Sequence, residues 1–159
     1  MTVIIQRVGV NDVIDLRHEV LRHGLPRHTA QFDGDDVPDA RHYAALIERR
    51  LVGCATLHPS RWDSRPAWQL RGMAVSSGER GRGIGRLLMH FMEKDLLDTP
   101  VLQLWCNARV PAIGFYQKLD WRVVSGVFEV PTAGPHVKMI RNLDGELRRN
   151  GESEQSPVR

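Results

Sequence analysis

The segment from Val75 to Gly85, VSSGERGRGIG, constrains the fold more than any other, because alternating glycines join an apolar strand to an amphipathic helix. Residues 68–75 are largely apolar and predict a central strand. Beyond Gly85, apolar residues recur at helical spacing as far as Leu96. Glycines let the backbone approach a ligand closely, and a helix start presents unpaired N–H groups and a partial positive charge. We therefore predict that this turn binds a pyrophosphate.

Two common phosphate-binding loops do not fit this segment. A P-loop requires Lys-Ser or Lys-Thr after its last glycine, and neither follows here. In the dinucleotide fingerprint the third glycine comes one residue later than Gly85, and no strand–helix–strand unit opens the chain. A tight turn with solvated arginines remains the simplest alternative. The segment alone therefore indicates a phosphate-bearing ligand without identifying it.

The patterns around this segment predict a single α/β domain, of the mixed α+β kind, over residues 1–142, and a flexible polar tail over residues 143–159. Residues 24–41 and 59–66 are predicted to be loops, and Gly72 inside the central strand predicts a bulge. The predicted strands cover 3–8, 43–47, 51–57, 68–75, 101–106, 122–124 and 137–141, and the predicted helices cover 13–21, 84–96 and 111–119.

Composition excludes several classes of protein. The two cysteines, Cys54 and Cys106, fit neither a disulfide framework nor a metal site, so we expect a cytoplasmic protein without a bound metal. We expect no membrane association, because no apolar run approaches the roughly 20 residues of a membrane helix. The net charge of +3 suits a polyanionic partner. Without a nucleic-acid-binding motif, and with only 6% aromatic residues, we expect a phosphate-bearing cofactor and no nucleic acid.

On these residues the chain resembles the GCN5-related N-acetyltransferase (GNAT) family. Arg80, Gly83 and Gly85 match the spacing of its motif A, and residues 70–75 occupy the place of its bulged fourth strand. Asn107 and the segment 112–121 resemble its motif B. The resemblance covers roughly residues 3–141, and the last predicted strand is similar to that of small bacterial N-acyltransferases.

The resemblance implies a mixed, mostly antiparallel sheet with helices on both faces and one splayed strand pair. It implies that acetyl-CoA is the acyl donor, that a primary amine attacks it directly in a ternary complex, and that Tyr116 protonates the leaving thiolate. It also allows a homodimer. The residues that it assigns to cofactor binding are Met73, Ala74, Val75, Arg80, Gly81, Arg82, Gly83, Ile84, Gly85, Arg86, Asn107 and Phe115.

The general base is harder to assign. Many relatives carry a glutamate where this chain has Arg71, and a guanidinium cannot act as a base. A chain of waters is one alternative, and the candidate side chains are His42, Asp35, Glu48 and His136. The two histidines are also candidates for contact with the acceptor. If the Arg71 side chain faces the cleft, we expect it to bind an acidic group of the acceptor; if it faces away, it is a surface charge.

Three further features stay open at the level of sequence. Arg17 and Arg22 fit either a solvated helix face or a wall of the acceptor site. The acidic run at residues 33–36 fits either a solvated loop or attraction of a cationic amine. The missing glutamate also leaves room for a non-catalytic acyl-CoA sensor, and the basic charge for a nucleic-acid-binding protein as the weakest alternative.

Overall fold

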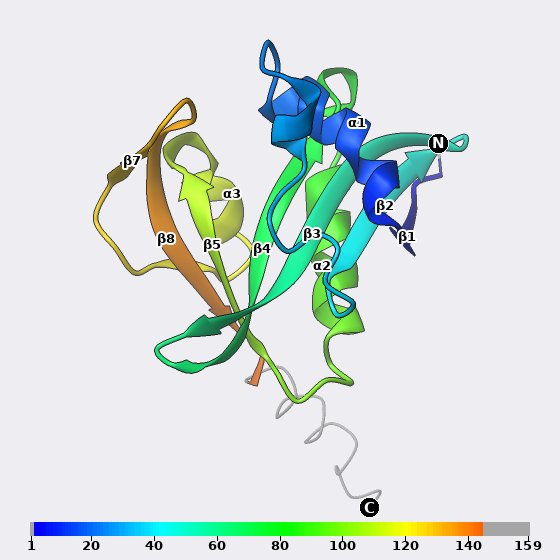
Figure 1. Cartoon of the computed structure of the whole chain (residues 1–159). Coiled ribbons are helices and arrows are strands. Elements are labelled where there is room, and N and C mark those ends of the chain that lie inside the picture. The colour runs from blue at the N-terminus through cyan, green and yellow to red at the C-terminus, as the bar shows by residue number, and fades with distance from the viewer. Residues whose placement is uncertain (1, 145–159) are drawn as a thin grey trace, which may run out of the picture.

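The structure is a computed structural model and describes residues 2–144. Within them, eight strands form one sheet in the order β1-β2-β3-β4-β5-β8-β6, and β7 pairs with β8 (Figure 1). The strands are β1 (Ile4–Val8), β2 (Arg41–Ile47), β3 (Arg50–Trp62), β4 (Arg65–Val75), β5 (Gln103–Arg109), β6 (Arg122–Val123), β7 (Phe128–Val130) and β8 (Gly134–Asn142). The helices are α1 (Val10–Leu21), α2 (Ile84–Asp95) and α3 (Ile113–Gln117).

Helices α1 and α2 cover opposite faces of the sheet (Figure 1). The larger core cluster lies on the α2 face, where Leu88 and Met92 of the helix pack on Tyr43 and Leu57 of the strands. The smaller cluster lies under α1. Apolar burial on both faces is the main force that holds such a layered domain together. The expected mixed, mostly antiparallel sheet with helices on both faces is thus confirmed.

Strand β4 carries the predicted bulge at Gly72. The pairing of β3 with β4 shifts register between Cys54 and Thr56, and Gly72 has a φ of 64°. A Cβ atom on Gly72 would lie 2.7 Å from Nε of Arg17, so both backbone conformation and space require glycine there. The bulge bends β4 at the place where it leaves its next neighbour.

Strands β4 and β5 form the splayed pair. They are parallel and paired only at Trp68 with Leu104 and at Gln69 with Trp105. Beyond these rows they separate, as Figure 1 shows, and β5 pairs with β8 on its other side. The edge of β4 that faces β5 is therefore open from Leu70 to its end at Val75.

The hairpin between β3 and β4 corrects one prediction. The segment 59–66 was expected to be a loop because it holds two prolines, but both strands run through it. Asp63 and Ser64 form a two-residue turn with φ values of 48° and 62°, as tight hairpins require. Pro59 is tolerated because β2 pairs with β3 only as far as Leu57, which leaves one edge of β3 free.

Smaller differences concern ends of elements. Helix α1 begins three residues before the predicted helix and is capped by Gly9, whose N–H donates to the Asp12 carboxylate. Strand β7 was not predicted. Asp120 closes the α3 turn with a φ of 67°, a left-handed conformation that Asp tolerates better than most residues. Leu143, assigned to the tail, is fully buried in the core, and the rest of that predicted tail from residue 145 lies outside the described residues.

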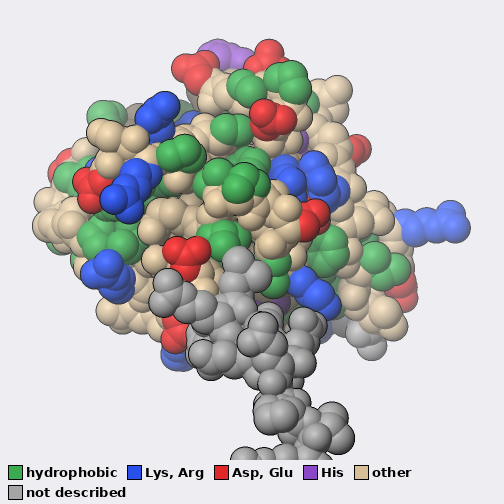
Figure 2. All heavy atoms as spheres, turned by 90° about the horizontal axis from the view of Figure 1, so that it is seen from below, with side chains coloured by type: hydrophobic (Ala, Val, Ile, Leu, Met, Phe, Trp, Pro, Cys, Tyr) green, Lys and Arg blue, Asp and Glu red, His purple; other side chains and the backbone are tan. Residues whose placement is uncertain are grey.

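The surface seen in Figure 2 mixes basic and acidic side chains without a continuous patch of either sign. The +3 charge of the chain is therefore not gathered on the face that Figure 2 shows.

Helices long and apolar enough to cross a membrane are absent from residues 2–144.

Candidate active site

A groove runs between the open edge of β4 and the start of α2. It is lined by the last three residues of β4, by the glycine-rich turn, by Pro111 and Ala112 just before α3, and by Phe115 within α3. Of the predicted cofactor residues, these line it: Met73, Ala74, Val75, Arg80, Gly81, Gly83, Ile84, Gly85, Arg86 and Phe115. The structure thus brings together ten predicted residues that come from three separate segments.

The turn before α2 has the backbone that its glycines predict. Gly81 and Gly83 have φ values of 79° and 78°, and Gly83 is the N-cap of α2 without a side-chain cap. The first-turn N–H groups of α2 are consequently not used by a capping side chain and carry the positive end of the helix dipole. This is an arrangement that accepts a phosphate group.

Close packing rather than φ explains Gly85. A Cβ atom on Gly85 would lie 3.1 Å from Cζ of Phe115 and 3.5 Å from Cε of Met73. The absence of a side chain at Gly85 therefore keeps β4, α2 and α3 in contact along the groove.

Arg82 and Asn107 do not line this groove. Arg82 donates to Glu79, a buried carboxylate that also pairs with Arg50. Glu79 itself lines the groove and was not predicted. Asn107 lies in the neighbouring cavity, where its Oδ1 accepts a hydrogen bond from Nζ of Lys138 at 2.9 Å.

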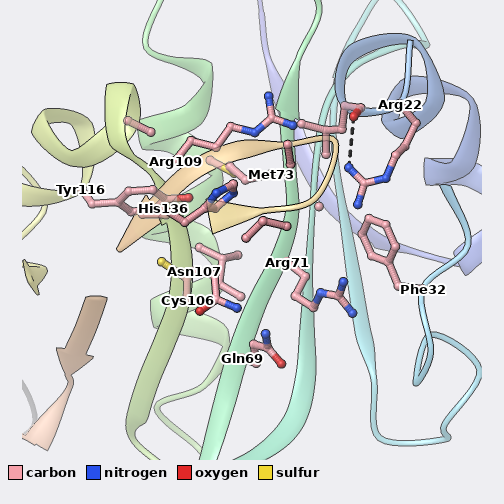
Figure 3. Close-up of a pocket in the computed structure, with 17 residues that line it drawn as sticks. Arg22, Phe32, Gln69, Arg71, Met73, Cys106, Asn107, Arg109, Tyr116 and His136 are labelled. Atoms are coloured by element: carbon pink, nitrogen blue, oxygen red, sulfur yellow. Dashed lines mark hydrogen bonds between the residues drawn. The ribbon is translucent and has the colours of Figure 1, made fainter. Parts of the chain in front are cut away.

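A second cavity of about 220 Å³ lies between the separated ends of β4 and β5 (Figure 3). It shares four lining residues with the groove: Leu21, Met73, Arg109 and Ala112. Two ligands bound in the groove and the cavity would therefore meet at the point where β4 and β5 separate.

Tyr116 lines this cavity from α3. Its ring contacts Phe115 edge-on, at 5.1 Å between centroids, and Trp121 in a tilted arrangement at 5.3 Å. In Figure 3 its hydroxyl end points toward the ring of His136. Burial, and to a smaller extent the nearby Cys106, raise the pKa of Tyr116 well above its usual value. The phenol is consequently protonated at neutral pH and is available as a proton donor.

His136 lines the same cavity from β8 and is buried. Its Nδ1 lies 2.8 Å from the carbonyl oxygen of Gly134. A carbonyl oxygen can only accept, so Nδ1 carries the proton and Nε2 of the neutral ring has a free lone pair. The ring is therefore held in the tautomer that can accept a proton through Nε2.

The other candidate bases lie elsewhere. Both ring nitrogens of His42 are used, by Oγ1 of Thr56 at 2.8 Å and by the Asp35 carbonyl oxygen at 2.9 Å. The Asp35 carboxylate accepts from Arg17 at 2.6 Å and from Nε2 of His58 at 2.8 Å. Glu48 belongs to the turn between β2 and β3. None of these three candidates is among the residues that line the cavity within residues 2–144.

Arg17 organises this buried network behind the cavity wall. The side chain is fully buried, and its guanidinium donates to Asp35, to Thr56 and to the carbonyl oxygen of Ala30. Hydrogen bonds from His58 and Arg17 outweigh the opposing effect of burial and hold the pKa of Asp35 well below its usual range. The loop after α1 is therefore tied to α1 by a buried ion pair and to β3 by hydrogen bonds through Thr56 and His58.

The cavity also contains arginines that face it from three segments. Arg71 of β4 faces the cleft, which decides between the two orientations considered from the sequence. Arg22 follows α1, and Arg109 ends β5. Arg22 thus forms part of the cavity wall, which is one of the two alternatives left open by the sequence. Phe32 and Arg109 were not predicted, because they belong to no shared motif and only the fold brings them together.

Comparison with known proteins agrees with this geometry. The model of the acetyltransferase (GNAT) family matches residues 11–121. The chain is 29% identical over 145 residues to the uncharacterized N-acetyltransferase YitI of Bacillus subtilis, which covers 87% of this chain and 95% of that protein. It is 28% identical over 92 residues to streptothricin acetyltransferase of Streptomyces lavendulae, covering 56% of this chain and 48% of that enzyme.

Solved structures show the same fold. Escherichia coli ElaA superposes with a TM-score of 0.74 at 22% identity, covering 89% of this chain and all of that one (100%). An aminoglycoside 6'-N-acetyltransferase complexed with coenzyme A superposes with a TM-score of 0.71 at 18% identity, covering 88% and 97%.

Proposed function

Because the chain belongs to the GNAT family of acetyltransferases, we propose that it transfers an acetyl group from acetyl-CoA to the primary amine of a small acceptor while both are bound. The observation that carries this proposal is the junction between the groove and the cavity at Met73, Arg109 and Ala112. It lets an amine in the cavity reach a thioester in the groove without an acetylated enzyme as intermediate. The pyrophosphate would bind at the Gly81–Gly85 turn, and the pantetheine arm would pair with the open edge of β4.

Cys106 supports direct attack over a covalent intermediate. It is the cysteine that lines the cavity, and a thiolate would be needed for it to accept the acetyl group. Burial raises the pKa of the Cys106 thiol to about 12. The thiol is therefore protonated at neutral pH and is a poor nucleophile.

Two residues that line the cavity can carry out the proton transfers that the reaction requires. The amine nitrogen forms a bond to the thioester carbonyl carbon, the carbon–sulfur bond breaks, and its electron pair goes to sulfur. Tyr116 gives its phenolic proton to that sulfur, which yields the free thiol of coenzyme A. His136 accepts the proton that the amine loses, through Nε2, and returns it to the tyrosinate through solvent.

The assignment of His136 as base rests on its position and tautomer. In the variant His136→Gln we expect kcat to fall roughly tenfold to a thousandfold, while the dissociation constant of acetyl-CoA stays within about twofold. A variant that keeps the wild-type kcat would return the role of base to a chain of waters.

The test of the proposed function has two stages. Addition of acetyl-CoA should raise the melting temperature, since a ligand that prefers the folded state stabilises it. A set of primary amines is then added, and release of coenzyme A thiol is followed together with the mass of the acetylated amine. Acetyl-CoA should give faster turnover than butanoyl-CoA or longer thioesters. No thermal shift with any acyl-CoA would refute the proposal, and a shift without turnover of any amine would indicate a sensor.

A further inference from the structure

The cavity that would hold the acceptor has walls of one charge. Seventeen residues line it, and among them are Arg22, Arg71 and Arg109 but no aspartate or glutamate. Its volume of about 220 Å³ is below the roughly 300–1,000 Å³ of sites for drug-sized ligands. The cavity therefore suits a small acceptor in a strongly positive environment.

These arginines are not neutralised within the described chain. The side chains of Arg71 and Arg109 have no hydrogen bond or ion pair with any of residues 2–144, and the side chain of Arg22 donates only to the carbonyl oxygen of Leu21 next to it. Burial, followed by the like charges of Arg109 and Arg17, lowers the pKa of Arg22. Unpaired charges in partial burial are costly, and natural proteins place them where a ligand of opposite charge binds.

The side chain of Arg71 is likewise an unpaired charge in partial burial. Burial lowers its pKa, and Arg17 and Arg22 act in the same direction against the opposing charges of Asp35 and Asp33. Asp35 is already committed to Arg17 and His58 by hydrogen bonds of 2.6 and 2.8 Å. Neither Asp35 nor Asp33 therefore pairs directly with the guanidinium of Arg71.

The aromatic ring of Phe32 holds these guanidinium groups in place. The guanidinium carbons of Arg71 and Arg22 lie 4.4 and 5.2 Å from the ring centroid, within the range of cation–π contacts. The backbone N–H of Phe32 donates to the Asp35 carboxylate at 2.8 Å, so the buried network of Arg17 fixes the ring. The donors are therefore oriented before any ligand binds, which reduces the entropy cost of binding.

We propose that the acceptor is a small primary amine that also bears an anionic group, carboxylate or phosphate, and that Arg71 and Arg22 bind this group while Arg109 adds to the positive field. The inference rests on the proposed function. A planar guanidinium matches the geometry of both oxyanions. The same positive charges disfavour the ammonium form of the amine, and the reaction needs the neutral form. Polycationic acceptors, such as polyamines and aminoglycosides, are disfavoured for the same reason.

The test compares acceptors in matched pairs, with and without the anionic group. Suitable pairs are 4-aminobutyrate with 4-aminobutyramide, L-alanine with L-alaninamide, and O-phosphoethanolamine with ethanolamine, and spermidine and kanamycin represent polycations. We expect kcat/KM to be at least tenfold higher for the anionic member of a pair, and lowest for the polycations. The first two pairs report on carboxylate and the third on phosphate.

Variants then link the preference to the arginines. Arg71→Gln should raise KM for the anionic acceptors roughly tenfold to a hundredfold, and should change KM for the partners that lack the anionic group, and KM for acetyl-CoA, much less. Arg71→Glu should invert the preference toward spermidine. The control is Arg65→Gln, which removes an exposed arginine at the start of the same strand.

Two outcomes separate this inference from the proposed function. If acetyl-CoA binds and the neutral or polycationic amines react as well as the anionic ones, or if Arg71→Gln leaves the preference intact, the inference fails and the acetyltransferase assignment stands. If acetyl-CoA binds but no amine reacts, titration of the coenzyme A complex with the anionic amines decides. Absence of tighter binding by these than by their neutral partners overturns the inference.

Discussion

The cofactor groove and the acceptor cavity meet at one point but are built differently. The groove is largely backbone: an open strand edge, two glycines with positive φ and the start of a helix. The cavity is made mainly of side chains from α1, the following loop, β4, β5, α3 and β8. Backbone geometry suits the phosphates and amides of one fixed cofactor, whereas side chains can be exchanged to suit different acceptors. The comparison suggests that changes in the two regions should affect different kinetic constants.

The largest effect is expected at the junction of the two regions. Tyr116→Phe should lower kcat roughly hundredfold to ten-thousandfold because the leaving sulfur loses its proton donor. The dissociation constant of acetyl-CoA, measured by calorimetry, should not change. The matched control is Tyr43→Phe, since the Tyr43 hydroxyl donates to Asp95 outside both cavities and its loss should reduce stability alone. Unchanged turnover in the Tyr116 variant would remove this residue from the mechanism.

The next effect concerns the support of the acceptor cavity. Arg17→Met leaves the Asp35 carboxylate buried without its main partner and should lower the free energy of unfolding by about 3–5 kcal/mol, measured with urea. KM for the acceptor should also rise, because Phe32 is no longer fixed. Arg141→Met is the control: it breaks another buried ion pair, with Glu93, at a distance from the cavity lining. Equal effects of both variants on KM would show that the network of Arg17 does not position the acceptor site.

A smaller effect is expected from the cofactor groove. Gly83→Val places a β-branched residue at a φ of 78° and should cost about 1–2 kcal/mol. We expect this cost to appear as a roughly tenfold weaker affinity for acetyl-CoA, with KM for the acceptor unchanged. Gly78→Ala, in the same turn but with ordinary φ and open space around it, serves as the control. If acceptor KM changes as much as cofactor affinity, the two regions are not separable.

The smallest effect is a dependence of stability on pH. Burial lowers the pKa of His42, so the unfolded chain binds a proton at a higher pH than the folded chain does. The stability from the neutral ring is present above the unfolded pKa of about 6.5 and declines as the pH falls below it. Asp35, with its lowered pKa, adds a further loss below about pH 4. Urea midpoints between pH 7 and pH 3 should fall in these two steps.

The variant His42→Gln provides the control for this titration. It retains hydrogen-bonding capacity toward Thr56 and Asp35 but does not titrate. Its urea midpoint should therefore decline less between pH 7 and pH 5 than that of the wild type. An unchanged decline would show that His42 is not the source of this pH dependence.

The difference between the groove and the cavity also explains which parts of the structure can be predicted from the sequence. The groove follows from local rules, because glycines, strand and helix start are adjacent in residues 70–86. Gly72 similarly predicts its bulge from the strand alone. The prediction failed at residues 59–66, where prolines suggested a loop and the free edge of β3 tolerates them. Local patterns do not reveal which strand edges lack a neighbour.

The acceptor cavity depends on contacts between distant segments. Arg71 had two open orientations, and only the bulged strand decides that it faces the cleft. Arg22 was equally compatible with a solvated helix face, and Arg109 had no distinguishing neighbours. His136 was one of four candidate bases, and its Nδ1 contact with Gly134 supports the proposal that it is the base. Charge and geometry of this kind arise from the folded arrangement rather than from any run of residues.

The two paired rows between β4 and β5 have a mechanical consequence. They are the main backbone link between one half of the sheet, β1 to β4, and the other half, β5 to β8. The two halves of the sheet are thus joined at one end of the β4–β5 boundary, and the proposed reactive centre lies along the part of this boundary where the strands do not pair. A cofactor arm that pairs with β4 closes part of this boundary, so occupation by the donor would stiffen the whole sheet and set the width available to the acceptor.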